Sequence, residues 1–163
     1  MEIIAQFKNY KSTFWQEALK ISHTQKGKPI KSTLIAPCGM NCRLCRAFIK
    51  GKNTCPGGRS EGSLKPKTRV ICKITNCNHL TKEMIKYCSD CDKYPCKNLN
   101  HLDKRYRAKY GMSLIDNLEN IKLNGIRHFV RQEKERWACS KCGETICVHK
   151  ESCIFCGHNG VSF

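Results

Sequence analysis

The sequence predicts a small α-rich (α+β) protein that is stapled by metal ions in place of a large hydrophobic core. The chain has 163 residues, of which 14 are Cys. Most of these Cys lie in short C-x2-C and C-x3-C steps, from which neighbouring thiolates can bind one ion. Elsewhere apolar residues recur at the three-and-four spacing of an α-helix. The expected order is an amphipathic helix, a linker, a cysteine-rich metal-binding module, a helical connector and a zinc ribbon hairpin (1–22, 23–35, 36–100, 101–137 and 138–163).

The N-terminal segment, residues 2–21, predicts an amphipathic helix that covers a core or a docking face. Both acidic and basic residues fill its polar side, which argues against a membrane-surface role. No basic region followed by an apolar run marks a signal peptide, and no later stretch is long enough to span a membrane. A cytoplasmic location is therefore expected. In that reducing compartment, closely paired Cys bind metal more often than they form disulfides.

The central module contains nine Cys, one more than two four-thiolate sites need. Cys38, Cys42 and Cys45 are spaced C-x3-C-x2-C and are expected to share one centre, with Cys55 as the nearest fourth thiol. Candidates for a second centre are Cys72, Cys77, Cys88, Cys91 and Cys96. Their order does not decide which thiol is idle, and His79 and His101 are alternative ligands. Residues 51–69, rich in Gly and Pro, predict a loop, and residues 80–88 predict a short helix.

Zinc is the expected ion in this module, and a [4Fe–4S] cluster is the alternative, because all-thiolate sites accept either. The C-x3-C-x2-C spacing also holds the cluster of radical S-adenosylmethionine enzymes, but those need a large barrel for which this chain is too short. The ferredoxin run C-x2-C-x2-C-x3-C-P is absent. An iron–sulfur cluster with a redox or structural role therefore remains an alternative for this module. "CSDC" (88–91) has the spacing of a redox motif, but ligation is the simpler interpretation among so many other Cys.

The connector from Asn98 to Trp137 predicts three helices. Gly111 ends the first, Ser113 caps the start of the second, and Gly125 suits its C-terminal cap. The residues expected to face the core are Leu99, Leu102, Tyr106, Tyr110, Leu114, Leu118, Ile121, Ile126, Phe129, Val130 and Trp137.

The C-terminal segment predicts a zinc ribbon made of two knuckles that are ten residues apart. Gly143 and Gly157 follow the second Cys of each pair, where the tight turn needs a permissive backbone. Cys147 and His149 lie between the pairs and are expected to be spare, because a complete thiolate set exists without them. So short a module cannot bury enough apolar surface to fold alone, and the ion would supply the missing free energy. The expected ligands are Cys139, Cys142, Cys153 and Cys156.

The formal net charge of +17 raises the prospect of a nucleic-acid partner. A four-thiolate zinc or iron–sulfur site carries about −2, so three such sites would lower the total to about +11. Residues 38–100 carry 13 Lys and Arg against 4 Asp and Glu, whereas residues 139–163 carry two of each. Any polyanion would therefore meet the central module. A solvated basic surface explains the charge equally well.

Three segments together resemble the prokaryotic cysteine-rich domain-of-unknown-function family 3795. They are "CGMNCRLC" (38–45), "CKITNC" (72–77) and "CSDCDKYPCKNL" (88–99). The resemblance covers residues 36–100 and extends, through the helical stretch and the ribbon, towards Gly157. It departs at "CPGG" (55–58), where Gly58 stands in place of a second Cys of the family pattern. The resemblance implies metal binding but no established activity.

These observations favour a metal-binding adaptor with a protein partner over an enzyme. The chain has no Ser–His–Asp pattern, P-loop or H-E-x-x-H motif, so no catalytic residue is expected, and all-thiolate sites suit closed structural centres. Two alternatives remain: an iron–sulfur redox or accessory protein, and an RNA- or DNA-binding zinc protein. The oligomeric state is not determined by the sequence.

Overall fold

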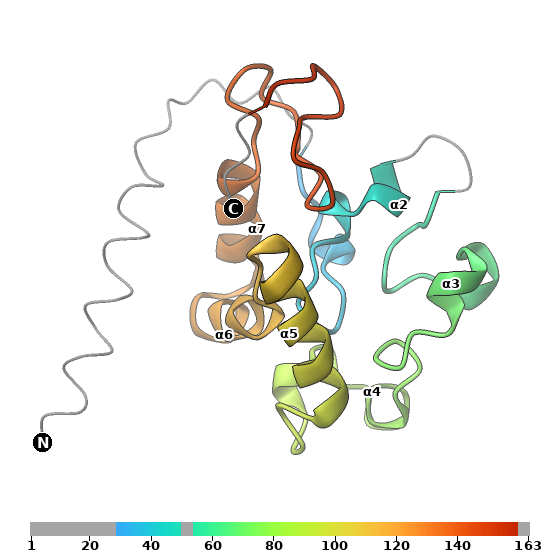
Figure 1. Ribbon diagram of the computed structural model, residues 1–163. Coiled ribbons are helices and arrows are strands. Elements are labelled where there is room, and N and C mark those ends of the chain that lie inside the picture. Colours follow the sequence, from blue (N-terminus) through green and yellow to red (C-terminus); the bar gives the residue numbers. More distant parts are fainter. Residues whose placement is uncertain (1–28, 50–53, 160–163) are drawn as a thin grey trace, which may run out of the picture.

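The computed structural model describes residues 29–49 and 54–159, and the helix expected over residues 2–21 lies outside these ranges. Three helices form the largest body: α5 (Lys97–Tyr110), α6 (Leu114–Asn124) and α7 (Ile126–Arg136). Helix α6 packs against both of the others. Figure 1 shows these three helices together, with the segment after α7 above them in this view and the short helices α2 and α3 to their right.

The predicted boundaries of these three helices are confirmed. Gly111 ends α5 in the left-handed conformation, with φ of 57°. Ser113 caps α6, because its hydroxyl accepts a hydrogen bond from the Asp116 N–H at 2.9 Å. Gly125, with φ of 80°, separates α6 from α7. All three signals are local in sequence, which is why the pattern alone located them.

The central module is built from short helical turns joined by loops. The helix expected over 80–88 is shorter and starts earlier than predicted: it is α4 (Asn78–Lys82), and Met84 beyond it has a positive φ of 49°. The loop expected over 51–69 holds one turn and the start of another helix. The other elements are η1 (Ser32–Leu34), η2 (Cys42–Leu44), α2 (Arg46–Ile49), η3 (Gly62–Leu64), α3 (Lys67–Val70) and η4 (Cys88–Asp90).

The paired strands of the expected ribbon hairpin are not found in the described part of the chain. Each Cys pair is closed instead by an isolated bridge of its own, Ala138 to Thr145 and Ser152 to Asn159. The segment between the pairs uses its backbone elsewhere: the Val148 N–H donates to the Leu44 carbonyl at 3.0 Å. The C-terminal segment therefore docks on the central module through the residues that were expected to form the hairpin.

One hydrophobic core joins the three helices to the first Cys box. Its most buried members lie in residues 35–44, in residues 99–129 and in the C-terminal segment, and they include Ile35, Leu44, Leu99, Met112, Leu114, Leu118, Phe129 and Val148. The Asn117 side-chain amide donates to the Gly39 carbonyl at 3.0 Å, which ties α6 to the box. The turn η4 also packs on α6. The Cys-bearing turns thus pack against the three helices.

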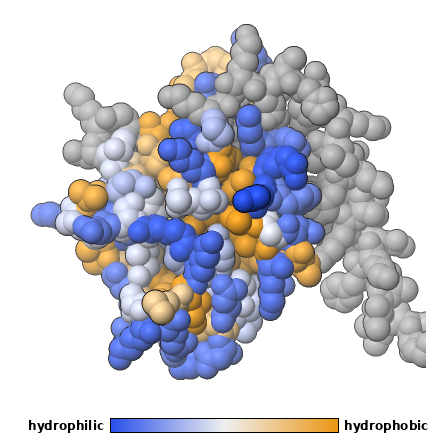
Figure 2. Space-filling view, turned by 180° about the vertical axis from the view of Figure 1, so that it is seen from behind, coloured by the Kyte–Doolittle hydropathy of each residue, from blue (hydrophilic) through white to orange (hydrophobic). Residues whose placement is uncertain are grey.

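The surface mixes hydrophilic and hydrophobic side chains. Figure 2 shows hydrophobic residues in several patches between hydrophilic ones on the face opposite that of Figure 1. The large hydrophobic residues with more than a third of their surface exposed include Leu64, Val70, Ile71, Met84, Leu123, Ile154 and Phe155. No helix in the described ranges combines the length and the apolar composition needed to cross a membrane.

Candidate metal centres

The structure brings together the four C-terminal thiols that the sequence predicted. All four Sγ atoms lie within 4.8 Å of one another. The Sγ atoms of Cys139 and Cys156 are 3.7 Å apart, and so are those of Cys142 and Cys153. Four sulfurs placed tetrahedrally at ~2.3 Å from a zinc ion would be ~3.8 Å apart. The site therefore has the size of a four-cysteine zinc centre.

The two turns that carry these thiols have the same backbone hydrogen bonds. The N–H of Gly143 donates to the Cys139 carbonyl, and the N–H of Gly157 donates to the Cys153 carbonyl, each at 2.8 Å. Both Gly have positive φ, 73° and 70°. Because Gly adopts this conformation without steric cost, each C-x2-C-G segment closes tightly and directs two thiols to the same point.

Backbone donors favour the thiolate at Cys139. Burial raises the pKa of this thiol, but N–H groups of Cys142 and Lys141 that point at its sulfur, together with hydrogen bonds to the Cys142 and Cys153 thiols, lower the pKa, while the same thiol contacts raise the pKa of Cys142. A ligand must lose its proton before it binds zinc, so a lowered pKa favours binding at neutral pH. Cys147 and His149 are not part of this group. The expectation that the four thiols form a complete set without them agrees with the geometry.

A second group of thiols lines a small cavity in the central module. The cavity has a volume of about 30 Å³, more than the ~10–15 Å³ that a water molecule needs. Burial raises the pKa of Cys88, and electrostatic repulsion from the neighbouring Cys96, Cys77 and Cys91 adds to this effect, so that the pKa reaches about 12. A bound cation would offset that repulsion, because a positive charge close to the thiols favours their charged form. The four thiols at the cavity are Cys77, Cys88, Cys91 and Cys96.

The remaining central thiols surround Cys42, which is buried. Burial raises its pKa to about 11, and repulsion from Cys45 and Cys55 contributes. Burial also raises the pKa of Cys38 to about 12, with contributions from Cys42, Cys88 and Cys72. The Cys38 thiol therefore interacts electrostatically both with Cys88 of the cavity group and with Cys72. Unlike the C-terminal set, neither central group has its Sγ atoms all within 4.8 Å.

The alternative histidine ligands have different surroundings. His79 lies within 4.8 Å of Cys91 and Asp92, in an arrangement that could hold an ion. Its Nδ1 is 2.8 Å from the Glu83 carboxylate and its Nε2 is 3.0 Å from the Lys93 ammonium, so it already has two partners. His101 is exposed on α5 and lines neither thiol group.

Cys147 and His149 connect the C-terminal segment to the first Cys box. Cys147 is fully buried, and its thiol interacts electrostatically with Cys45. The Arg46 N–H donates to His149 Nδ1 at 3.4 Å. The His149 ring also packs edge-on against Tyr110, with ring centroids 4.8 Å apart. These residues, spare as ligands, form part of the contact between the two segments.

Sequence reasoning missed a buried polar network behind the first box. Glu133 on α7 is 3% exposed. Its carboxylate accepts hydrogen bonds from the Asn41 amide at 3.1 Å and from the Trp137 indole at 3.2 Å. Burial raises the pKa of Glu133. The spacing of Glu133 from the predicted core residues Phe129, Val130 and Trp137 is the signal in the sequence that places it on the buried face of α7.

The fold and these sites define a small helical, cysteine-rich protein with one four-thiol group that could hold a metal ion. Residues 34–101 match a family model described as "Protein of unknown function (DUF3795)". This confirms the resemblance seen in the three Cys-containing segments. No curated protein and no solved structure matches the chain.

Proposed function

We propose that this protein is a zinc-binding adaptor in which thiolate centres rigidify surfaces for a protein partner. The observation that carries the proposal is the C-terminal four-cysteine group, whose sulfur–sulfur distances of 3.7 Å fit one tetrahedral zinc ion. A closed four-thiolate set leaves no open position for a substrate, which favours a structural role over catalysis. The two central thiol groups would bring the total to about three zinc ions per chain.

A partner surface is available on the second C-terminal turn. Ile154 and Phe155 lie between Cys153 and Cys156, and their exposed fractions are 44% and 53%. A bound ion would hold the backbone of this turn from both sides, so the two apolar side chains would be presented at low entropic cost. Exposed apolar residues on a rigid turn favour a protein partner over a polyanion.

The first test is the zinc content of full-length protein and of two variants. Cys139→Ser removes one ligand of the C-terminal group, and we expect it to lose one zinc per chain and to unfold residues 138–159. Cys147→Ser is the matched control in the same segment and should keep every zinc. Elemental analysis together with the visible absorption spectrum makes the measurement. Wild-type protein without zinc would contradict the proposal, and four iron per chain with visible absorbance would assign a cluster to the central thiols.

A further inference from the structure

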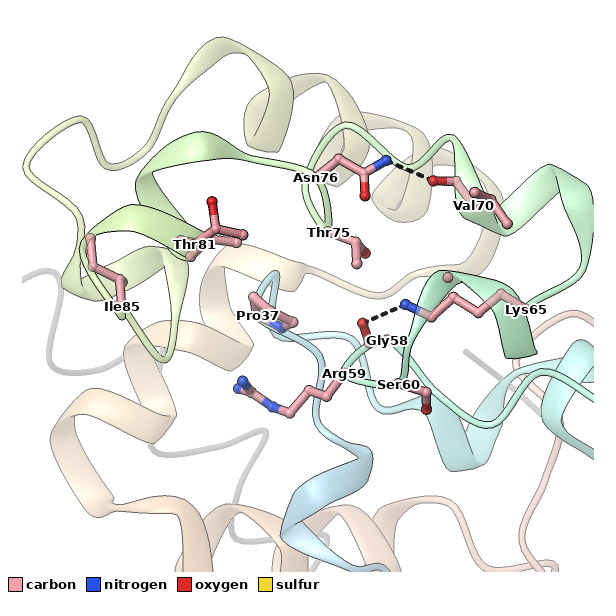
Figure 3. A pocket seen from close by; sticks show the side chains of 12 residues that line it. Pro37, Gly58, Arg59, Ser60, Lys65, Val70, Thr75, Asn76, Thr81 and Ile85 are labelled. Carbon is pink, nitrogen blue, oxygen red and sulfur yellow. Dashed lines mark hydrogen bonds between the residues drawn. The ribbon is translucent and has the colours of Figure 1, made fainter.

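The central module contains a second cavity, and none of its described lining residues is Cys. Its volume is about 360 Å³, which falls within the ~300–1,000 Å³ that is usual for small-molecule sites. The lining comes from Pro37 before the first Cys box, from the loop that precedes α3, from the end of α3 and from the segment around α4. Figure 3 shows these segments facing one another across the cavity.

Lys65 places a buried ammonium in the lining of this cavity. The residue is 8% exposed, and its Nζ donates to the Gly58 carbonyl at 3.0 Å (Figure 3). An ammonium can donate three hydrogen bonds, and the described residues supply this one acceptor. None of the ion pairs between described residues includes Lys65. Because burying an ammonium is costly unless an anion lies close by, the cavity favours an anionic ligand.

Arg59 adds a second positive charge, which is held in place by the backbone. Its Nε donates to the Ile35 carbonyl at 2.7 Å, and its Nη2 donates to the Lys86 carbonyl at 2.8 Å. The guanidinium also lies over the Tyr87 ring, 4.8 Å from the ring centroid. None of the twelve described residues that line the cavity is Asp or Glu. The lining therefore carries two positive charges and no negative one, a distribution that attracts anions.

The neutral side chains of the lining suit an oxyanion attached to an apolar group. The Ser60 hydroxyl can donate one hydrogen bond, and the Asn76 amide, which gives one N–H to the Val70 carbonyl at 2.6 Å, has a second. In the view of Figure 3, Asn76 and Ser60 lie on opposite sides of the Lys65 ammonium. The apolar part of the lining consists of Pro37, Val70, Leu80 and Ile85.

We propose that this cavity binds a small molecule through a phosphate monoester. Such a group carries about −1.5 to −2 at pH 7, which matches the two cations of the lining. The Lys65 ammonium and the Arg59 guanidinium bind its oxygens, Ser60 and Asn76 supply neutral donors, and the apolar residues contact the organic part. The inference goes beyond the proposed adaptor function and does not rest on a metal ion.

The test compares three probes by isothermal titration calorimetry of the full-length protein at constant ionic strength. The probes are phenyl phosphate, inorganic phosphate and phenol. We expect phenyl phosphate to bind more tightly than inorganic phosphate, because the apolar residues of the lining cover its ring. Phenol, which has no charge to match the two cations, should show no binding.

Lys65→Met and Lys67→Met form a matched pair of variants. Lys65→Met should weaken the binding of phenyl phosphate at least ~10-fold, because it removes a hydrogen bond between charged groups. Lys67, on α3, is exposed and does not line the cavity. Removing the same charge there should change the affinity by less than ~2-fold, because salt screens an exposed charge.

Hydrogen-exchange mass spectrometry of the wild type gives a readout that needs no variant, should Lys65→Met fold poorly. Phenyl phosphate should slow amide exchange in residues 58–65 and 75–81, which line the cavity. Exchange in α6 and in residues 138–159 should stay the same, because these segments do not line it.

Four results would overturn the inference. Without any binding of phenyl phosphate, the charge of Lys65 would be balanced by a group of the protein itself. Equal losses of affinity in Lys65→Met and Lys67→Met would indicate a general basic surface. Equal affinity for benzoate would remove the preference for phosphate. Displacement of phenyl phosphate by an oligonucleotide without terminal phosphates would indicate a site for the diester backbone. None of these results changes the zinc content expected for Cys139→Ser, so the proposed function is tested separately.

Discussion

Gly39 and Gly125 have almost the same φ angle but very different surroundings. Their φ angles are 81° and 80°. A Cβ on Gly39 would lie 2.6 Å from the Leu114 carbonyl oxygen and 2.9 Å from Leu118 Cγ, whereas a Cβ on Gly125 would meet nothing within 4 Å. At the residue scale, Gly39 therefore lets the first Cys box sit directly on α6, while Gly125 serves only the turn between two helices.

Substituting Ala for Gly39 and for Gly125 separates the energetic cost of backbone strain from the cost of steric contact. Gly125→Ala should lower the free energy of unfolding by about 2 kcal/mol, because φ of 80° with ψ of 158° is a backbone conformation that essentially only Gly adopts. Gly39→Ala carries similar strain and must also displace α6, so we expect a loss of at least ~3 kcal/mol. Urea denaturation of metal-loaded protein measures both. Equal losses would show that the contact between the box and α6 is easily displaced.

At the scale of elements, one carboxylate on α5 organises the start of α6. Asp103 is 5% exposed. Its Oδ1 accepts from the backbone N–H groups of Leu114 and Ile115 at 2.7 and 3.0 Å and from the Ser113 hydroxyl at 3.1 Å. Its Oδ2 accepts from Arg107 Nε at 2.6 Å. These bonds satisfy backbone donors that the first turn of a helix cannot satisfy itself.

This cap makes stability depend on pH in acid. Burial raises the pKa of Asp103, but the hydrogen bonds from Ile115, Arg107 and Ser113 outweigh it and lower the pKa below the usual 3.8. A depressed folded-state pKa gives stability that is complete above 3.8 and is lost as the pH falls through the folded value. Asp103→Asn should cost about 2 kcal/mol at pH 7, because bonds to a charged acceptor are lost.

The control for this cap is Asp116→Asn. Asp116 meets the same Arg107 at 3.0 Å, but its side chain is 70% exposed, and an exposed pair is worth little. Chemical denaturation at pH 7 and at several values below 3.8 should show the Asp103→Asn difference narrowing as the pH falls. A difference independent of pH would mean that the shape of the side chain matters and its charge does not.

At the scale of the whole molecule, two kinds of interaction hold different parts of the chain. The helices α5, α6 and α7 share apolar residues that are almost fully buried, such as Leu99, Leu118 and Phe129. Residues 138–159 have isolated bridges and two thiol-bearing turns, and two of the four residues that they add to the buried core, Cys139 and Cys153, belong to the four-thiol group. The hydrophobic effect can stabilise the helices, whereas we expect the C-terminal segment to depend on a bound ion.

Metal removal should therefore loosen the molecule unevenly. After chelation, we expect amide hydrogen exchange to accelerate strongly in residues 138–159 and 72–96. The amides of α6, which lies between two helices, should keep most of their protection. Hydrogen-exchange mass spectrometry with and without zinc measures this. Equal acceleration in α6 would mean that the three helices depend on the metal as much as the turns do.

The sequence by itself determined the local features of this protein. Ser113, Gly111 and Gly125 mark helix ends through contacts with near neighbours, and the C-x2-C-G segments define turns of five residues. Such features depend on spacing alone, so the three long helices and the C-terminal four-cysteine group were predicted correctly. The cysteine-rich segments likewise indicated the family whose model matches residues 34–101.

The tertiary structure decided what depends on residues distant in the chain. The burial of Lys65 and the approach of Gly39 to α6 depend on how the helices fold back on the first box. Glu133 meets Asn41 across 92 positions, a separation that no periodicity encodes. The segment between the C-terminal knuckles formed no strands because its backbone bonds to Leu44 instead. Packing and hydrogen bonding of this kind are settled only when the chain closes on itself, since each partner is chosen by three-dimensional proximity.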